Sequence, residues 1–230
     1  MTSTIVARRT GKAAKILTAA EELILKQGFK GVTMAAVAQR AHVGKGTAYL
    51  YWRTKEDPFL ELLVDSLAGV LADLADRVRA TPGLAMADRL CPAIADAWLA
   101  RPLVRALQVT DSDVLGALLD DPRSHAIVVE NGIPALIGTL LPLWRDRDLV
   151  RADWSLDDVT AALEFLFVGY FVTRTRGAVG GSHGDHIDVL RRAVAAVLLT
   201  RESAVPDDDL TETVCEVLEN HAQRLRELVV

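Results

Sequence analysis

The spacing of apolar residues constrains the fold of this chain more than any other feature of its sequence. Between residues 12 and 27 they recur every three or four positions, at Ile16, Ala19, Ala20, Leu23 and Ile24, which places them on one face of a helix. Similar spacing recurs in later stretches, at 59–74, 155–176, 186–201 and 207–228. The alternation typical of a β-strand does not occur. An aromatic content of 5% and abundant Ala and Leu also favour helices, so we predict an all-α fold.

Glycine, proline and capping residues divide the N-terminal part into three helices. Gly28 lies where the C′ residue of the first helix would be, and Thr33 is a suitable N-cap for a second helix. His42-Val43-Gly44 interrupts the second helix, and a third short helix follows over about residues 45–52. Two short helices joined by a three-residue turn are typical of a helix-turn-helix motif, here residues 33–52.

Longer helices are predicted beyond Pro58, which suits the first turn of a helix. Pro134 interrupts an apolar segment and should break its helix. Ser155 with Asp158 resembles a capping box, and Asp185 is a cap for the helix that follows. We therefore divide the chain into a basic arm, a helix-turn-helix domain, a larger helical domain and a C-terminal helix: residues 1–11, 12–57, 58–206 and 207–230.

Charge is distributed unevenly along the chain. The net charge of −5 conceals ten basic and two acidic residues, hence +8, over residues 1–55, against −13 over the remainder. All six lysines lie in those first 55 residues. This asymmetry predicts that the N-terminal segment faces nucleic acid, with an ordinary solvated basic surface as the alternative.

Helical geometry sorts the side chains of the motif into inner and outer positions. Val43, Ala48 and Trp52 can point inward, so that the first helix braces the second. The residues available to base edges are Lys45, Gly46, Tyr49 and Leu50. Those positioned for phosphates are Thr47, Tyr51 and Lys55. The alternatives are packing for the tyrosines and ordinary surface charge for the lysines.

A larger set of residues at fixed offsets resembles the DNA-binding domain of TetR-type transcriptional regulators. The similarity covers about residues 12–65 and includes residues 15–21, Gly28-Phe29, Thr33, Val37-Ala38, Ala41, residues 43–52 and Lys55-Glu56. The chain departs from the family at Gly44, where serine is common, and at Ala48 and Trp52, where leucine and phenylalanine are usual. We interpret the last two as a volume-conserving exchange.

The resemblance implies a role for each matching residue. Lys45, Gly46 and Tyr49 resemble base-contacting positions. Thr33, Thr47, Tyr51 and Lys55 resemble positions that contact the DNA backbone, which fixes register without specifying sequence. Arg8, Arg9 and Lys12 form either a basic arm that reaches DNA or an inert tail.

The resemblance also implies that residues 58–206 bind an effector and form a homodimer. The helices at 155–176 and 186–201 resemble the pair that forms the family's dimer interface, with burial inside the protomer as the alternative. The interface residues expected are Val159, Leu163, Leu166, Phe167, Tyr170, Ile187, Leu190, Val194 and Val197. The C-terminal helix could extend this interface or lie over its own domain.

A pocket for a small-molecule effector is expected among the helices from 59 to 171. Apolar candidates for its lining are Met86, Trp98, Trp144, Phe165 and Phe171, and Arg105 or His125 could orient a polar group. For each of these residues, plain core packing is the competing interpretation.

Catalytic and metal-binding patterns carry little weight. Residues 180–184 match the Gly-x-Ser-x-Gly pattern of a hydrolase nucleophile elbow, but a helical pattern precedes them where a strand is required. His183, Asp185 and His186 are too few for a closed metal site. We therefore expect no enzyme activity, no cofactor and no metal.

Compartment is predicted from cysteine use and hydropathy. Cys91 and Cys215 cannot form a disulfide framework, which indicates a reducing compartment. The longest strictly apolar run, residues 193–199, is far shorter than the ~18 residues of a membrane span, and residues 1–9 lack the apolar region of a signal peptide. The chain is predicted to be cytoplasmic.

The sequence thus predicts a homodimeric, ligand-responsive repressor that binds an inverted-repeat operator in double-stranded DNA. One alternative is a helical enzyme or carrier whose basic N-terminal region does not recognise sequence. Another is a regulator that has lost its effector and acts constitutively.

Overall fold

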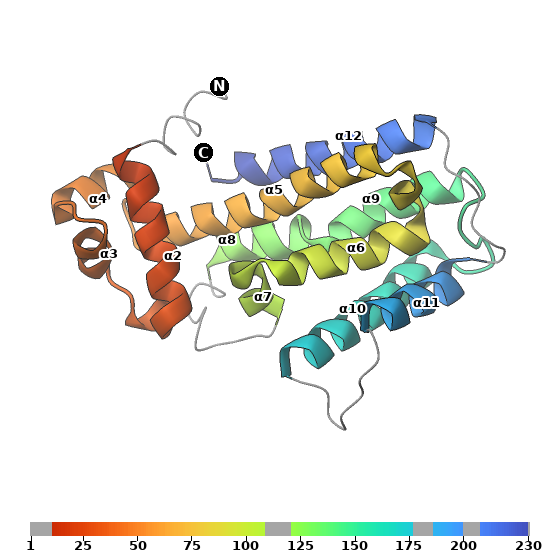
Figure 1. The fold of residues 1–230 in the computed structure, drawn as a ribbon, viewed down its shortest axis with the longest axis horizontal. Coiled ribbons are helices and arrows are strands. Elements are labelled where there is room, and N and C mark those ends of the chain that lie inside the picture. Colours follow the sequence, from red (N-terminus) through yellow and green to blue (C-terminus); the bar gives the residue numbers. More distant parts are fainter. Residues whose placement is uncertain (1–10, 109–120, 177–185, 200–207, 230) are drawn as a thin grey trace.

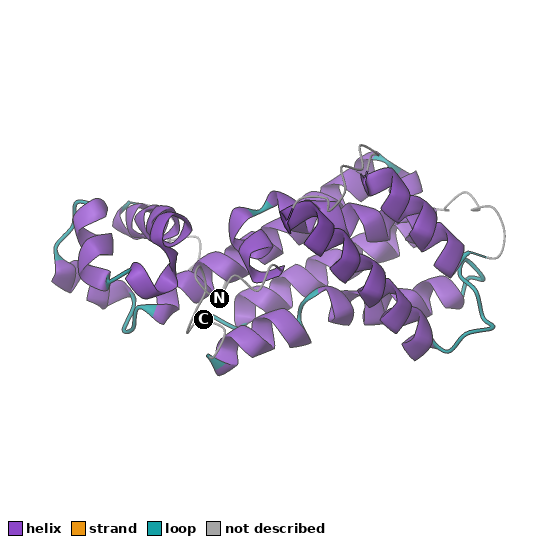
Figure 2. Ribbon diagram, turned by 90° about the horizontal axis from the view of Figure 1, so that it is seen from below, coloured by secondary structure: helices purple, strands orange, loops and turns teal. Residues whose placement is uncertain are grey.

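Every regular element of the described residues is a helix, which confirms the all-α prediction (Figure 2). The computed structural model describes residues 11–108, 121–176, 186–199 and 208–229. Three helices form a small domain at one end of an elongated molecule, and the others form a larger bundle (Figure 1). The elements are α2 (Lys12–Gly31), α3 (Met34–Arg40), α4 (Lys45–Tyr51), α5 (Glu56–Ala80), η1 (Pro82–Ala85), α6 (Ala87–Ala100), α7 (Pro102–Gln108), α8 (Pro122–His125), η3 (Ala126–Glu130), α9 (Ile133–Arg145), α10 (Leu156–Arg176), α11 (His186–Leu198) and α12 (Asp208–Glu227).

Local signals set the boundaries of the first three helices. Gly28 has a φ of 72° and interrupts the regular part of α2 where its end was predicted. The Thr33 hydroxyl accepts a hydrogen bond from the Ala36 amide at 3.1 Å and so caps α3. His42, in the turn before α4, has a φ of 55°. The predicted helix-turn-helix is therefore present.

A single long helix, α5, connects the two parts of the molecule. It begins at Glu56 with Pro58 in its first turn, and its apolar face is buried along nearly its full length. The predicted domain boundary between residues 57 and 58 therefore falls inside a helix. Because α5 runs on into the bundle (Figure 1), both parts share one continuous element.

The bundle is built on α5 and α6. The C-terminal helix α12 packs along α5, α11 packs along α6, and α10 contacts both α11 and α9. Ion pairs of 2.6 Å, Arg79 with Glu219 and Arg147 with Asp209, tie α12 to α5 and to the end of α9. Of the two positions left open for the C-terminal helix, the structure has the one over its own domain.

The predicted helix start at Ser155 and the predicted helix break near Pro134 are both found in the bundle. The Ser155 hydroxyl accepts from the Asp158 amide at 3.1 Å and donates to the Asp158 carboxylate at 2.7 Å, which caps α10. Pro134 lies in the first turn of α9, after the short π-helix η3. Asp185, the predicted cap of α11, lies outside the described residues.

The predicted dimer face of α10 and α11 is largely buried inside the protomer, which is the alternative that the sequence left open for these residues. Six of its residues are at most 6% exposed: Val159, Leu163, Phe167, Tyr170, Leu190 and Val194. Leu166, Ile187 and Val197 are half-buried against the same core. The Tyr170 hydroxyl donates to Asp96 of α6 at 3.2 Å. Helical spacing shows which face is apolar, but it does not show which chain covers that face.

Candidate DNA-binding site

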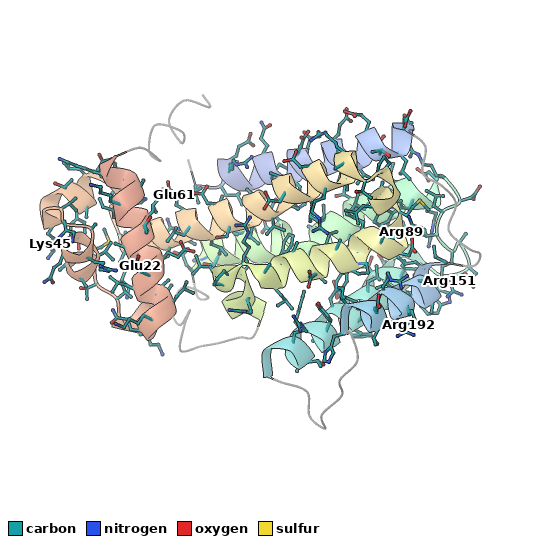
Figure 3. The ribbon with its side chains drawn as sticks, viewed as in Figure 1. Glu22, Lys45, Glu61, Arg89, Arg151 and Arg192 are labelled. Carbon is teal, nitrogen blue, oxygen red and sulfur yellow. The ribbon has the colours of Figure 1, made fainter. Side chains whose placement is uncertain are left out.

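Helix α4, the second helix of the helix-turn-helix motif, lies in the part of the molecule farthest from the bundle (Figure 1). Figure 3 shows Lys45 at that end, with Glu22 of α2 and Glu61 near the start of α5 closer to the bundle. The N-terminal end of α4 is thus open to a large partner.

The side chains of α4 divide into a buried and an exposed face. Ala48 is fully buried, whereas Tyr49 is 43% and Leu50 85% exposed. Lys45 and Gly46 are exposed too, and the Lys45 Nζ lies 5.8 Å from the centre of the Tyr49 ring. The structure therefore brings all four residues predicted to face base edges to the surface. Their contacts with bases stay a prediction.

The residues predicted to contact phosphates have less uniform surroundings. Thr33 is exposed, and its hydroxyl, which accepts the α3 capping bond, still has a proton to donate. Thr47 and Tyr51 are half-buried, and the Tyr51 ring lies 5.6 Å from that of Trp52. These three contacts also stay predictions.

Trp52 anchors the C-terminal end of α4. Its side chain is 3% exposed, and its indole N–H donates to the Glu61 carboxylate at 2.8 Å. A buried indole N–H needs an acceptor, and Glu61 supplies it from α5. We predicted that Trp52 points inward but did not predict Glu61. The signal was a single acidic residue within the apolar run 59–64.

Asp57 holds the loop that follows α4. Its carboxylate accepts hydrogen bonds from the amides of Arg53 (3.0 Å) and Thr54 (2.9 Å) and from the Thr54 hydroxyl (2.8 Å). Arg123 of the bundle helix α8 donates to Asp57 at 2.9 Å and to Asp121 at 2.8 Å. Burial raises the pKa of Asp57, but the bonds from Thr54 and Arg123 outweigh it and hold that pKa below its usual value. The bundle is thus ion-paired to the residue that shapes this loop, which we had not predicted.

Lys55 makes its contacts inside the domain. Its ammonium donates to the carbonyl oxygens of Phe29 (3.2 Å) and Val32 (3.5 Å) and lies 4.1 Å from the centre of the Phe29 ring. Two of its three donors are therefore occupied at the C-terminal end of α2, where a cation is favoured. Lys55 therefore connects α2 to the loop after α4, a role that we had not predicted, and its contact with phosphate stays a prediction.

A groove of about 480 Å³ lies beside the turn between α3 and α4. Its lining includes Lys12 and Lys15 of α2 together with Arg40 and His42. Arg40 is ion-paired with Glu22 at 2.5 Å. Glu22 also lines the groove, so its lining carries both signs of charge. Arg8 and Arg9 of the predicted basic arm lie outside the described residues.

Comparison with known proteins identifies this domain. Residues 16–62 match the family described as bacterial regulatory proteins, tetR family. We call residues 16–62 the TetR-family domain, after the family model that they match. Over 64 residues the chain is 41% identical to the uncharacterized HTH-type transcriptional regulator YdeS of Bacillus subtilis (strain 168). Over 49 residues it is 39% identical to the HTH-type transcriptional regulator QacR of Staphylococcus aureus (strain Mu50 / ATCC 700699).

Each of these two matches covers only a part of either chain. They cover 26% and 21% of this chain, and 32% of YdeS and 26% of QacR. The chain thus spans a third or less of the length of the curated relatives it matches.

The fold of the whole molecule is shared with solved structures. FadR from Bacillus subtilis, a transcriptional regulator in complex with stearoyl-CoA, has a TM-score of 0.58 at 15% identity and covers 83% of this chain and 100% of that one. The fatty acid degradation regulator FadR from Bacillus halodurans has a TM-score of 0.55 at 14% identity, with 85% and 98% covered. The bundle that follows the TetR-family domain here therefore has the architecture seen in those regulators.

The predicted pocket residues are divided between the core and the surface. Met86, Trp98, Trp144 and Phe171 are at most 4% exposed. Phe165 is 78% exposed, so its assignment to an interior pocket was wrong. It is two residues, or about 200°, from the buried Leu163 and Phe167, and so lies on the opposite face of α10. Arg105 is exposed on α7, and the side chain of His125 lies outside the described part.

Other predicted features concern membranes and metals. Within the described ranges, no helix is long and apolar enough to cross a bilayer. The same ranges hold no group of three or more His, Cys, Asp or Glu that could bind a metal. The Gly-x-Ser-x-Gly segment, His183 and Asp185 lie outside them. Cys91 and Cys215 are buried free thiols.

Proposed function

We propose that this chain is a sequence-specific, homodimeric transcriptional regulator that binds an inverted-repeat DNA operator. The observation that carries the proposal is the placement of α4, whose Lys45 and Leu50 are exposed at the outer end while Trp52 anchors the helix from behind. A helix presented in this way can enter the major groove, where all base pairs are distinguishable. The TetR-family domain supports this proposal, as do the two curated relatives, both named as transcriptional regulators.

A second copy of the chain is proposed to cover the outer face of α10 and α11. Phe165, Val168 and Val172 lie on one stripe of α10 and are 78%, 59% and 41% exposed. Val189 of α11 is 54% exposed. A group of large apolar side chains that one helix exposes on the same face is typical of an interaction site. Pairing of two copies would present two α4 helices to major grooves one turn apart, ~34–36 Å, or a multiple of that distance.

The bundle is proposed to bind a small effector that releases the protein from DNA, which makes it a repressor. FadR of Bacillus subtilis, which has this fold, was crystallised with stearoyl-CoA. In this chain Met86, Trp98, Trp144 and Phe171 belong to the apolar interior in which an apolar ligand would be enclosed. Release requires that the effector bind the DNA-free conformation more tightly than the DNA-bound one.

Selection from a pool of random DNA duplexes, followed by footprinting, tests the proposal. We expect one enriched inverted repeat that a dimer protects, with an affinity that falls steeply as salt rises, because basic residues displace counterions from several phosphates. The Lys45→Ala variant should no longer rank operator variants as the wild type does. If Lys45 contacts a base, its discrimination between the right and the wrong base at that position should fall by ~1–3 kcal/mol.

Lys26→Ala serves as the control for this experiment, because Lys26 is exposed on α2 but outside the proposed contact set. It should keep the wild-type ranking. A pool in which no sequence is enriched at low salt contradicts the proposal and favours a helical enzyme or carrier.

A further inference from the structure

The face of α4 that points away from the rest of its domain is apolar. With 3.6 residues per turn, successive residues are about 100° apart around a helix. Gly46 and Leu50 therefore lie on either side of the line directly opposite the buried Ala48. Lys45 and Tyr49 flank this line on one side, and Thr47 and Tyr51 flank it on the other. The part of α4 that would enter a groove most deeply thus offers a leucine and a glycine.

Leu50 is the more exposed of the apolar groups on this line. At 85%, it is more exposed than any other large apolar side chain in the described residues. The rest of the protomer covers almost none of the Leu50 side chain, so only a binding partner can remove it from water. At this position on the recognition helix, that partner is the operator.

Gly46 is not required by packing within the domain. A Cβ at this position would meet no atom within 4 Å, and Gly46 is not among the residues with positive φ. Glycine is a poorer helix former than alanine, so its presence brings α4 no local benefit. What it does allow is a close approach of the helix backbone to a partner. Gly46 and Leu50 are therefore interpreted together, as two parts of one contact with that partner.

We propose that Leu50 contacts the C5 methyl group of a thymine in each half-site, and that Gly46 lets α4 approach that base. This inference rests on the proposed function and specifies the chemistry of one operator base. The thymine methyl is the apolar group that base pairs present in the major groove, and apolar side chains contact it there. Discrimination at this base therefore arises from burial of a methyl group, without a hydrogen bond.

Replacement of single thymines by deoxyuridine in the selected duplex removes only that methyl group and so tests the proposal. We expect one thymine per half-site whose replacement weakens binding about fourfold, and roughly fifteenfold when both half-sites are changed. In the Leu50→Ala variant the same replacement should leave the affinity unchanged. The melting temperature of this variant should match the wild type, because Leu50 is exposed.

Two further variants serve as controls. Leu25, 40% exposed on α2, is the matched leucine, and Leu25→Ala should keep the wild-type response to deoxyuridine. Gly46→Ala should melt at the same or a higher temperature yet bind the operator roughly tenfold more weakly or worse, because the added Cβ prevents the close approach.

The outcomes separate the inference from the proposed function. If thymine and deoxyuridine bind equally at every position, or if Leu50→Ala loses as much affinity as the wild type on replacement, the assignment of Leu50 is wrong. If no duplex is enriched from the random pool, the proposed function itself is wrong.

Discussion

At the scale of single residues, Lys55 lies half-buried between the C-terminal end of α2 and the loop after α4, bonded to two backbone carbonyls. Lys55→Met keeps an apolar stem beside Phe29 but removes the charge and both hydrogen bonds. We expect the free energy of unfolding to fall by about 1 kcal/mol, since the site is only partly buried. Operator affinity should fall similarly for all operator sequences, because the loop that positions α4 loses a support. Urea unfolding and titration with operator variants measure the two effects.

Lys45→Met is the matched control for that substitution. Lys45 is exposed, and its ammonium is 5.8 Å from the Tyr49 ring, so unfolding should change by less than about 0.5 kcal/mol. Its effect should instead be an altered ranking of operators. Equal destabilisation by the two substitutions would show that the carbonyl contacts of Lys55 contribute nothing.

At the scale of helices, α10 has apolar residues on both an inner and an outer face. Phe165→Glu places a charge on the outer face, where it is exposed in the protomer but would be buried and unpaired against a second copy. We expect a folded monomer that no longer binds an inverted repeat. Sedimentation velocity measures the oligomeric state, and circular dichroism shows that the helices are retained.

Leu228→Glu provides the comparison at this scale. Leu228, just beyond α12, is 38% exposed and lies outside the proposed interface, so this variant should stay dimeric. A Phe165→Glu variant that sediments as a dimer would place the interface elsewhere.

At the scale of the whole molecule, Arg123 joins the bundle to the TetR-family domain through Asp57. In the Arg123→Ala variant the Asp57 carboxylate still accepts hydrogen bonds from the backbone amides of Arg53 and Thr54. Thermal stability should therefore change little, as is usual when an ion pair near the surface is removed. The orientation of the domain relative to the bundle becomes less restricted, however. We therefore expect operator affinity to fall by roughly 1 kcal/mol, within the range of typical couplings between sites. Fluorescence anisotropy with labelled operator measures it.

The control at this scale is Arg191→Ala, which breaks a more exposed ion pair within α11, Arg191 with Asp188 at 3.3 Å. It should leave operator affinity unchanged, and an equal loss in both variants would contradict a special role for Arg123.

The loss of operator affinity caused by Arg123→Ala should also be constant across neutral pH. The pKa of Asp57 is depressed, so the stability this ion pair contributes is present above the usual value of 3.8 and is lost only as the pH falls through the lowered value.

The sequence determined those parts of the structure that depend on a few neighbouring residues. The interruption of α2 at Gly28, the caps at Thr33 and Ser155, and the break near Pro134 each follow from the backbone preferences or the hydrogen bonds of one residue. The exposed face of α4 was predictable for the same reason. Over seven residues, the position of Ala48 decides which side chains point away.

Only the tertiary structure decided which partner each element meets. Trp52 was expected to point inward, but its acceptor Glu61 is nine positions away on another helix, and Arg123 reaches Asp57 across 66 positions. The sequence showed that the inner face of α10 is apolar, but it did not show that α9 and α11 of the same chain cover that face. An amphipathic pattern records how much apolar surface a helix must bury, and it is the same whether that surface is covered by the same chain or by another.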